Sequence, residues 1–417
     1  MIPDDEHSAV RLLRPLAGEP ARPAQLDLVR AMREGRQRRR ARWWATGTAV
    51  AALTAASVTG GTVAVGALDV GQPQHVKPTA AASISPSGAA AAPDVEPVRC
   101  RIDRLPTDGV QKALVTGGDP SGRYLVGRTY PGNGDQRNRP IVVWKDDKLV
   151  ATLRLPGGDG SLDDINGNGI GVGSSFKNEV STPWLYSAGA VQELLGGTGT
   201  AVAINEAGVI AGSIGARPVR WASAKAQPVL LKLPDGATEG AAKDVDEDGT
   251  ILGTVGTATT QTGYLWLPDG TGRKMPLPLV AGKPATSFWP VALRGGWVTG
   301  RATYETADSA TFAPYRYRVD QDRYEALPAQ ARLPARIATN GWVAGISWNA
   351  SNSLTARGYI QPTIFTDRGE VPLPLYGKAG DDYEITALSD DGGIVAGYSV
   401  GSADANVRND PLVWHCG

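Results

Sequence analysis

Histidine and cysteine are scarce in this chain, and their scarcity limits the chemistry it can perform. The 417 residues include three histidines and two cysteines, and His415 is the only histidine beyond residue 97. A serine–histidine–aspartate triad, a multi-histidine zinc or copper site and a cysteine–histidine nucleophile therefore lack the residues they need. We expect no metal and no cofactor, and we expect His415 to be structural.

Charge is missing from one long segment near the N-terminus. Residues 43–68 are 26 consecutive residues without Asp, Glu, Lys or Arg, which is long enough for a membrane-spanning helix. Residues 1–42 carry ten arginines against six acidic residues, and basic flanks favour the cytoplasmic side. The sequence predicts a basic cytoplasmic arm (1–42) and a single-pass transmembrane helix (43–68) in the cell membrane, with the rest outside. A cleaved export signal, giving a secreted protein, is the alternative.

The segment that follows lacks large apolar side chains. Residues 69–97 consist mainly of Ala, Pro, Ser and Gly, which is typical of an extended linker rather than a packed domain. The basic arm could also bind a cytosolic partner, although its role in setting membrane orientation is the simpler explanation.

A pattern of about ten residues recurs seven times in the remaining chain. It is found at 164–173 (DINGNGIGVG), 203–212 (AINEAGVIAG), 244–253 (DVDEDGTILG) and 336–345 (RIATNGWVAG), and in looser form at 118–127, 292–300 and 387–397. The closing glycines lie 39 to 52 residues apart, which matches the length of one propeller blade.

Each repeat continues with an apolar segment that usually ends in an aromatic residue, followed by a run that closes on Leu-Pro or Pro-Leu. The apolar segments are 140–144, 183–186, 218–221, 263–266, 314–317, 362–365 and 411–414, and the closing runs are 153–156, 230–234, 274–279, 324–328 and 370–375. Four short β-rich stretches separated by Gly, Asn, Asp and Pro predict a four-stranded antiparallel meander, with strands a, b, c and d. We therefore predict an all-β fold, a seven-bladed β-propeller over residues 98–417.

The last repeat stops after its third strand, and a matching piece is found at the other end of the domain. Residues 98–109 resemble a closing run and have no other strands of their own repeat. We predict that this N-terminal strand completes the last blade beside residues 411–416. Cys100 and Cys416 would lie on these neighbouring strands, and an exported domain favours a disulfide between them.

The turn between strands a and b contains Asn-x-x-Gly or Asp-x-x-Gly in the best repeats. An Asn or Asp side chain can cap its own backbone there, and glycine accepts the positive φ. The turns at Asp164 and Asp244 also resemble the first half of an EF-hand loop, but the position that requires a bidentate Glu is Ser175 or Val255. We interpret both as capped turns rather than calcium sites.

These residues carry a family resemblance. The D-x-N-x-x-G-x-I-x-G unit with its aromatic ending resembles the HAF-type extracellular repeat over residues 98–417, best in the second, third and fourth repeats. The resemblance implies a β-propeller of exported proteins and provides no catalytic residues. The full chain is similar in organisation to single-pass actinobacterial surface proteins.

Binding residues are expected on the rim that holds the connections between strands b and c (the b–c rim). These connections are longest in repeats one, five, six and seven, at 128–139, 301–313, 346–361 and 398–410, which are neighbours around a closed ring. Aromatic residues mixed with arginine are typical of recognition surfaces, although such residues also pack locally. The candidate ligand-binding residues are Arg128, Tyr130, Arg301, Tyr304, Phe312, Trp348, Asn349, Arg357, Tyr359, Tyr398 and Arg408.

We predict a membrane-tethered extracytoplasmic propeller that binds a cell-envelope glycan or a protein partner and is not an enzyme. The alternative is a carboxylate-dependent glycoside hydrolase or lyase, because paired Asp or Glu side chains would suffice for it. Nucleic acid is not an expected ligand, since the exported part is mildly acidic and its Lys and Arg residues are scattered.

Overall fold

The structure is a computed structural model that describes most of the predicted propeller. The described residues are 99–132, 139–177, 180–215, 217–257, 260–306, 309–349, 359–377, 382–400 and 409–417, and all of them belong to one compact unit. Thirty β-strands and no helix are found in these ranges, and so no helix there is long and apolar enough to cross a membrane. The predicted arm, transmembrane helix and linker lie outside these ranges.

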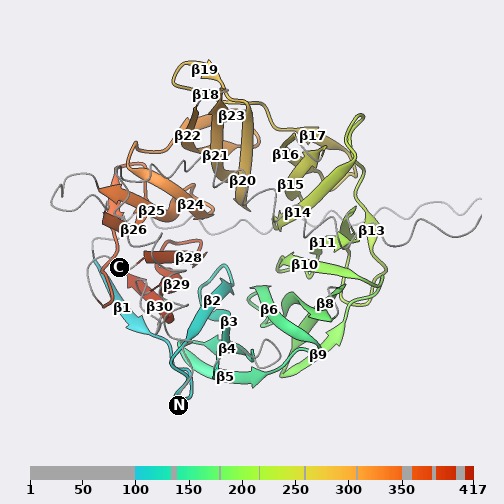
Figure 1. Ribbon diagram of the computed structural model, residues 1–417, viewed down its shortest axis with the longest axis vertical. Helices are drawn as coiled ribbons and strands as arrows, with labels where there is room; N and C mark the ends of the chain where they lie inside the picture. Colours follow the sequence, from blue (N-terminus) through green and yellow to red (C-terminus); the bar gives the residue numbers. More distant parts are fainter. Residues whose placement is uncertain are drawn as a thin grey trace, which may run out of the picture. The chain divides into compact units, whose positions relative to one another are not determined.

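Seven four-stranded antiparallel sheets are arranged around a ring (Figure 1), which confirms the predicted seven-bladed propeller. Blades 1 to 3 are β2 (Ala113–Gly118), β3 (Tyr124–Thr129), β4 (Ile141–Lys145) and β5 (Lys148–Leu153); β6 (Gly158–Ile165), β7 (Gly171–Lys177), β8 (Val180–Ser187) and β9 (Ala190–Glu193); and β10 (Gly199–Ile204), β11 (Ile210–Ile214), β12 (Arg217–Trp221) and β13 (Val229–Leu230). Blades 4 to 6 are β14 (Glu239–Val245), β15 (Ile251–Gly256), β16 (Gln261–Trp266) and β17 (Gly272–Lys274); β20 (Ser287–Arg294), β21 (Trp297–Glu305), β22 (Ala310–Arg318) and β23 (Arg323–Ala326); and β24 (Ala331–Ile337), β25 (Val343–Asn349), β26 (Tyr359–Phe365) and β27 (Glu370–Pro372).

Blade 7 contains strands from both ends of the propeller. Its order is β28 (Asp382–Leu388), β29 (Ile394–Val400), β30 (Asn409–Cys416) and then β1 (Cys100–Arg104) on the outside. Cys100 is opposite Cys416 in the β1–β30 register, and the two are joined by a disulfide with a Cα–Cα distance of 4.1 Å. The bond that the sequence suggested is therefore present.

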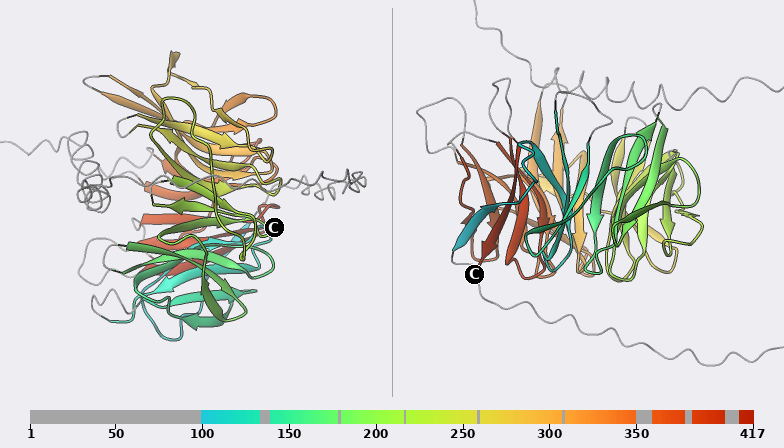
Figure 2. Two further views of the ribbon diagram at one scale, coloured as in Figure 1. Left: turned by 90° about the vertical axis from the view of Figure 1, so that its right-hand side faces the viewer. Right: turned by 90° about the horizontal axis from the view of Figure 1, so that it is seen from below.

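Between blades 4 and 5 there is one further element, a small hairpin of β18 (Leu279–Val280) and β19 (Lys283–Pro284). In the seven blades, the strands run from one face of the ring to the other (Figure 2). The first strand of each blade lies nearest the centre (Figure 1). These inner strands are therefore the ones that can line a central channel.

The core is buried between neighbouring blades rather than within any one of them. In the interface of blades 7 and 1, Leu105, Val115, Leu125, Trp144 and Val413 form one cluster, and all five are at most 1% exposed. Such burial contributes about 25 cal/mol for each Å² of apolar surface removed from water. A single blade would leave these faces in water, which is why the repeats are stable only as a ring.

The tryptophan near the end of strand c reaches the preceding blade. The indole N–H of Trp221 donates to the carbonyl of Leu195 (2.8 Å), and that of Trp266 donates to the carbonyl of Lys232 (2.8 Å). Trp414 and Trp144 make the equivalent bonds to Pro374 (2.8 Å) and Pro106 (2.7 Å). The repeated aromatic and the repeated closing run are thus the two halves of one link between blades.

The structure differs from the sequence-based strand boundaries in two respects. The paired part of strand d generally precedes the Leu-Pro of the closing run, and Leu155, Leu194, Met275 and Leu373 then turn inward and are buried. In blade 5, the predicted loop 301–313 is mostly a hairpin, because β21 continues to Glu305 and β22 begins at Ala310. The prediction missed this because it ended strand b at its closing glycine, although residues 301–305 continue with the alternating polar and apolar side chains of a half-buried strand.

The turns between strands a and b have the predicted caps. Asn166 Oδ1 accepts the N–H groups of Asn168 and Ile170 (both 3.1 Å), and Gly169 has φ 73°. The same side chain donates to the carbonyl of Asn205 in the next blade (3.0 Å). These turns therefore fix both the hairpin and its neighbour.

Candidate functional site

A β-bulge interrupts the inner strand of every blade at the same position. The extra residues, here called the bulge ring, are Thr116, Asp163, Val202, Lys243, Val291, Ala335 and Thr386. A bulge breaks the alternation of a strand, so two consecutive side chains can lie on one face. In blades 2 and 4, the pairs Asp163–Asp164 and Lys243–Asp244 both line a central cavity of about 110 Å³.

The closing glycine of each repeat is explained by this bulge. A Cβ atom on Gly127, Gly173, Gly212 or Gly397 would collide with the carbonyl oxygen of the inner strand, two residues before the bulge. The close backbone approach leaves room only for hydrogen. The closing glycine, which is the most regular feature of the sequence, is therefore required for the bulge that faces the channel as well as for the pairing of strands within the blade.

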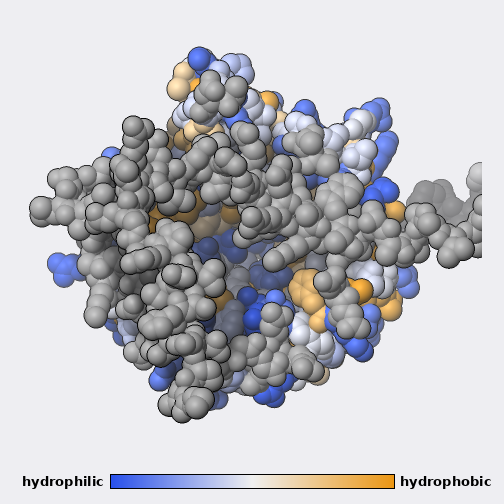
Figure 3. All heavy atoms as spheres, in the orientation of Figure 1, coloured by the Kyte–Doolittle hydropathy of each residue, from blue (hydrophilic) through white to orange (hydrophobic). Residues whose placement is uncertain are grey.

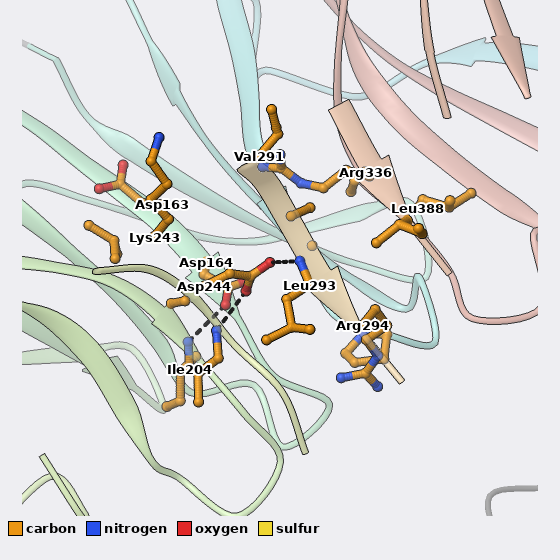
Figure 4. Close-up of a pocket in the computed structure, with 18 of the residues that line it drawn as sticks. Asp163, Asp164, Ile204, Lys243, Asp244, Val291, Leu293, Arg294, Arg336 and Leu388 are labelled. Atoms are coloured by element: carbon orange, nitrogen blue, oxygen red, sulfur yellow. Dashed lines mark hydrogen bonds between the residues drawn. The ribbon is translucent and has the colours of Figure 1, made fainter. Parts of the chain in front are cut away.

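All seven inner strands contribute to the cavity, and its charged side chains come from only four of them. These side chains are Asp163 and Asp164 on β6, Lys243 and Asp244 on β14, Arg294 on β20, and Arg336 on β24. Hydrophilic residues are visible in the hollow at the centre of the ring (Figure 3). In Figure 4, the side chains of Asp163 and Lys243 point in the same direction, and that of Arg336 extends towards Val291.

Two of the three carboxylates are tied to the backbone of another blade. Asp164 Oδ2 accepts the N–H of Ile204 (2.8 Å), and Asp244 Oδ2 accepts the N–H of Leu293 (2.8 Å). Asp163 has no such bond and interacts with the Ser161 side chain. Asp164 and Asp244, which the sequence placed in the a–b turns, are therefore at the ends of inner strands and connect neighbouring blades.

Burial shifts the pKa of each of these groups in the direction that favours its neutral form. It raises the pKa of Asp163 and of Asp244 to about 6, and it raises the pKa of Asp164 to about 8 with a further contribution from the charge of Asp244. Arg336 partly offsets the rise in the pKa of all three carboxyls. Burial also lowers the pKa of Lys243 to about 8, because a low dielectric disfavours each charged form.

One arginine bridges the end of the channel nearest the a–b turns. Arg294 Nε and Nη2 donate to the two carboxylate oxygens of Asp390 on the turn of blade 7, both at 2.8 Å. Its Nη1 donates to Glu247 on the turn of blade 4. The guanidinium therefore links three blades by charge-assisted bonds. Because Arg294 and its partners lie at the a–b end, a ligand would enter the channel more easily from the b–c rim.

The b–c end of the channel carries an exposed aromatic residue. Two residues before the bulge in blades 5 and 6, Trp289 and Leu333 are 45% and 52% exposed. Lys243 Nζ lies 3.9 Å from the centre of the Trp289 ring. Trp289 therefore lies beside Lys243, which lines the charged cavity.

Several predicted rim residues meet where blades 7 and 1 adjoin. The Tyr130 ring has three cationic neighbours, Lys112, Arg128 and Arg139, at 5.2 to 5.3 Å from its centre. Arg128 and Arg139 both pair with Asp159. The Tyr398 hydroxyl donates to Glu384, and the charges of Tyr130 and Arg128 also affect the pKa of Tyr398, which burial raises.

The remaining predicted rim residues are spread over blades 5 and 6. Arg301 stacks on Phe312 at 4.8 Å, and both are strand residues rather than loop residues. Tyr304 packs on the core of blade 5 and has Lys283 near its ring. Trp348 is 38% exposed. Asn349 on β25 is opposite Tyr359 on β26 in the strand register.

Two of the candidates, Arg357 and Arg408, lie outside the described residues. Within the ranges that the structure describes, no group of three or more His, Cys, Asp or Glu side chains could hold a metal ion.

Sequence reasoning missed the channel residues Asp163, Lys243, Trp289 and Arg336. The residue just before the motif varies between apolar, hydroxyl, acidic and basic side chains in the seven repeats, but the position of the Asx turn varies as widely, so this variation did not single out the bulge ring. Nothing in periodicity shows that it faces a channel.

No protein-family model matches this chain, and no curated protein matches its sequence. Solved structures with a similar fold include TolB from Acinetobacter baumannii, with 14% identity, 69% of this chain and 80% of that chain covered, and a TM-score of 0.38. A putative gluconolactonase has 13% identity, coverage of 78% and 97%, and a TM-score of 0.37. Dipeptidyl peptidase 4 of Porphyromonas gingivalis has 10% identity and a TM-score of 0.41, and this chain, 71% of which is covered, spans 57% of its length.

Proposed function

We propose that this protein is a membrane-tethered, extracytoplasmic β-propeller of the HAF-repeat type that binds a cell-envelope glycan. The observation that carries the proposal is the exposed Trp289 at the b–c end of β20, in contact with Lys243, which lines a charged cavity. Sugar rings stack on aromatic faces while polar groups satisfy their hydroxyls. Tyr130, Tyr398 and Trp348 are further aromatic residues at the b–c ends of blades 1, 7 and 6.

A glycan fits this surface better than a protein partner. Protein interfaces usually have a broad core of aromatic and apolar side chains. Here the described rim and channel aromatics belong to four different blades, and Arg128 and Arg139 are paired with Asp159 beside Tyr130. A chain of sugar residues could follow such a curved, mixed surface.

Binding also accounts for the channel better than hydrolysis does. Glycoside hydrolysis generally requires two carboxyl groups that are free to act on the substrate. Asp164 and Asp244 accept backbone N–H groups of other blades, which leaves Asp163 as the one channel carboxyl without a backbone donor. Its raised pKa of about 6 is the specific observation that favours the hydrolase alternative.

The test is capture of the full-length protein on an array of bacterial cell-envelope glycans. We expect Trp289→Ala and Trp348→Ala each to weaken capture by about 1–2 kcal/mol with little change in melting temperature. Arg217→Ala, on the short b–c turn of blade 3, is the control and should bind normally. Capture of an envelope protein but no glycan, or loss of folding in both tryptophan variants, would contradict the proposal, and hydrolysis that Asp163→Asn abolishes would replace it with the enzyme alternative.

A further inference from the structure

Two cationic side chains in the channel form no direct ion pair with a carboxylate. Among the described residues, no carboxylate lies within ion-pair distance of Lys243 or Arg336. Lys243 contacts the Trp289 ring, and Arg336 Nη1 donates only to the carbonyl of Ala335 (2.9 Å). In contrast, Arg294 is paired with Asp390 and Glu247. Arg336 acts on the channel aspartates only through longer-range charge, and a recessed cation that lacks a direct partner is stabilised when an anionic group reaches it.

The two cations flank the inner strand that carries the aromatic surface. Lys243 is on β14 and Arg336 is on β24, while Trp289 and Val291 are on β20 between them. Arg336 extends towards Val291 in Figure 4. A group that enters along β20 would therefore meet a positive charge on either side.

The neighbouring carboxylates do not remove this preference. Asp164 and Asp244 already accept backbone N–H groups, and Asp164, with a pKa of about 8, is mostly protonated near neutral pH. Asp163 and Asp244 can take up protons as an anion approaches, because their pKa values are already raised to about 6. The net charge of the channel can thus become more positive when an anionic group binds.

The cavity is large enough for the acidic group of a sugar but too small for the sugar ring that carries this group. A cavity of roughly 150 Å³ holds a benzene molecule, and this one measures about 110 Å³. It has room for a carboxylate or phosphate group but not for a sugar ring as well. The ring would remain outside, at the level of Trp289.

We propose that the channel is the subsite for an acidic sugar residue, whose carboxylate or phosphate is bound between Lys243 and Arg336 while its ring lies on Trp289. This inference rests on the proposed function and adds the class of glycan. It also assigns the glycan a direction, with the acidic residue innermost and the remaining chain on the b–c rim.

The experiment is titration of the full-length protein with four monosaccharide probes, followed by tryptophan fluorescence or calorimetry. Glucuronic acid and glucose 6-phosphate supply the two anionic groups, glucose is the neutral match, and glucosamine is the cationic one. We expect either or both anionic sugars to bind at least about tenfold more tightly than glucose and glucosamine. Equal binding of glucose, tighter binding of glucosamine, or no binding up to concentrations on the order of 10 mM would overturn the inference.

Variants separate a binding role from a structural one. Lys243→Met and Arg336→Met should each weaken glucuronic acid binding by about tenfold while leaving glucose unchanged. Lys274→Met, on the outer strand β17, is the matched control and should bind as the wild type does. Anion binding that survives both channel substitutions in folded protein would refute the assignment.

The pH dependence provides a second readout. Asp163, Asp164, Lys243, Asp244, Arg294 and Arg336 face the cavity, and Arg128 acts on it from the rim. Between about pH 8.5 and 5.5, the aspartates gain protons and Lys243 becomes fully charged, so glucuronic acid should bind more tightly as pH falls. Glucuronic acid affinity that instead rises with pH would contradict an anion subsite governed by these groups. Loss of the anion preference with intact glycan capture would contradict this inference alone, whereas loss of all glycan capture would contradict the proposed function.

Discussion

At the scale of single residues, the main finding is that acidic groups in this protein connect blades. Asp164 receives a backbone N–H from blade 3, and Asp246 receives those of Gly295 and Gly296 from blade 5 (2.9 and 2.8 Å). The sequence identifies these residues as special, because Asp and Asn recur in the motif. It does not distinguish a side chain that caps its own turn from one that caps the next blade.

Asp164→Asn should change how stability depends on pH. The pKa of Asp164 is raised from an ordinary value near 3.9 to about 8 in the folded protein. Its contribution to stability is therefore fully present below about pH 4 and is lost as pH rises through about 8. Asparagine keeps an acceptor for the Ile204 N–H but has no charge, so the variant should gain up to about 4 kcal/mol over the wild type between pH 5 and 8.

The measurement is the melting temperature of both proteins at the two pH values. Asp235→Asn, an exposed position, is the control and should show no such difference. If the gap between Asp164→Asn and the wild type is the same at both pH values, the carboxyl does not carry a buried charge.

At the scale of strands, the blade is readable from sequence because each of its parts has a local cause. The Asx turn, the closing glycine and the aromatic end of strand c are residue types with distinct backbone or packing requirements. The bulge is different, since it results from how strands a and b pair. The closing glycine is its only signal in the sequence. The long hairpin of blade 5 was missed because strand b was ended at its closing glycine, although Ala302 beyond it is fully buried and Tyr304 packs on the core.

Trp221→Phe tests the link between the aromatic end of strand c and the preceding closing run. Trp221 is fully buried, and its indole N–H donates to the Leu195 carbonyl. Phenylalanine would lose this bond and leave space in the interface, so we expect destabilisation by about 2–3 kcal/mol. Trp184, whose N–H donates to the Ser175 hydroxyl in its own blade (2.8 Å), is the comparison, and Trp184→Phe should cost clearly less by denaturant unfolding. Equal costs would mean that the link between blades adds nothing.

At the scale of the whole molecule, β1 makes the boundary between blades 7 and 1 like every other boundary. Leu105 is buried there, Pro106 accepts the Trp144 indole, and Arg104 pairs with Asp410 at 2.7 Å. The sequence allowed this arrangement to be expected because the missing strand d of the last repeat has one match, at residues 98–109. Which ligand the ring binds could not be read in the same way, since the channel side chains do not follow the repeat.

We expect the Cys100–Cys416 bond to form in exported protein and to hold this boundary closed. The loop it closes spans 316 residues, for which chain entropy gives roughly 5–6 kcal/mol as an upper figure. Peptide mapping without reduction should find one cross-linked pair, and Cys100→Ser should lower the melting temperature by several degrees. Free alkylation of both thiols in the folded, exported protein would show that the ring is not closed this way.

The predicted membrane topology is tested by reporter fusions. Alkaline phosphatase fused after residue 97 should be active, and the same enzyme fused at residue 30 should be inactive, because it folds only outside the cytoplasm. A mature protein that begins near residue 69 would rule out the anchor while leaving export intact.

The bulge ring has a consequence for how this scaffold can diversify. Its seven positions already hold threonine, valine, alanine, aspartate and lysine on the same backbone. None of these residues is among the fully buried side chains of the core, although Thr116 donates to the Leu162 carbonyl of blade 2, so an exchange at most of these positions need not disturb the core. Different side chains can therefore occupy equivalent positions around the channel on one backbone. A new ligand preference could arise by single substitutions that leave the fold of each blade unchanged.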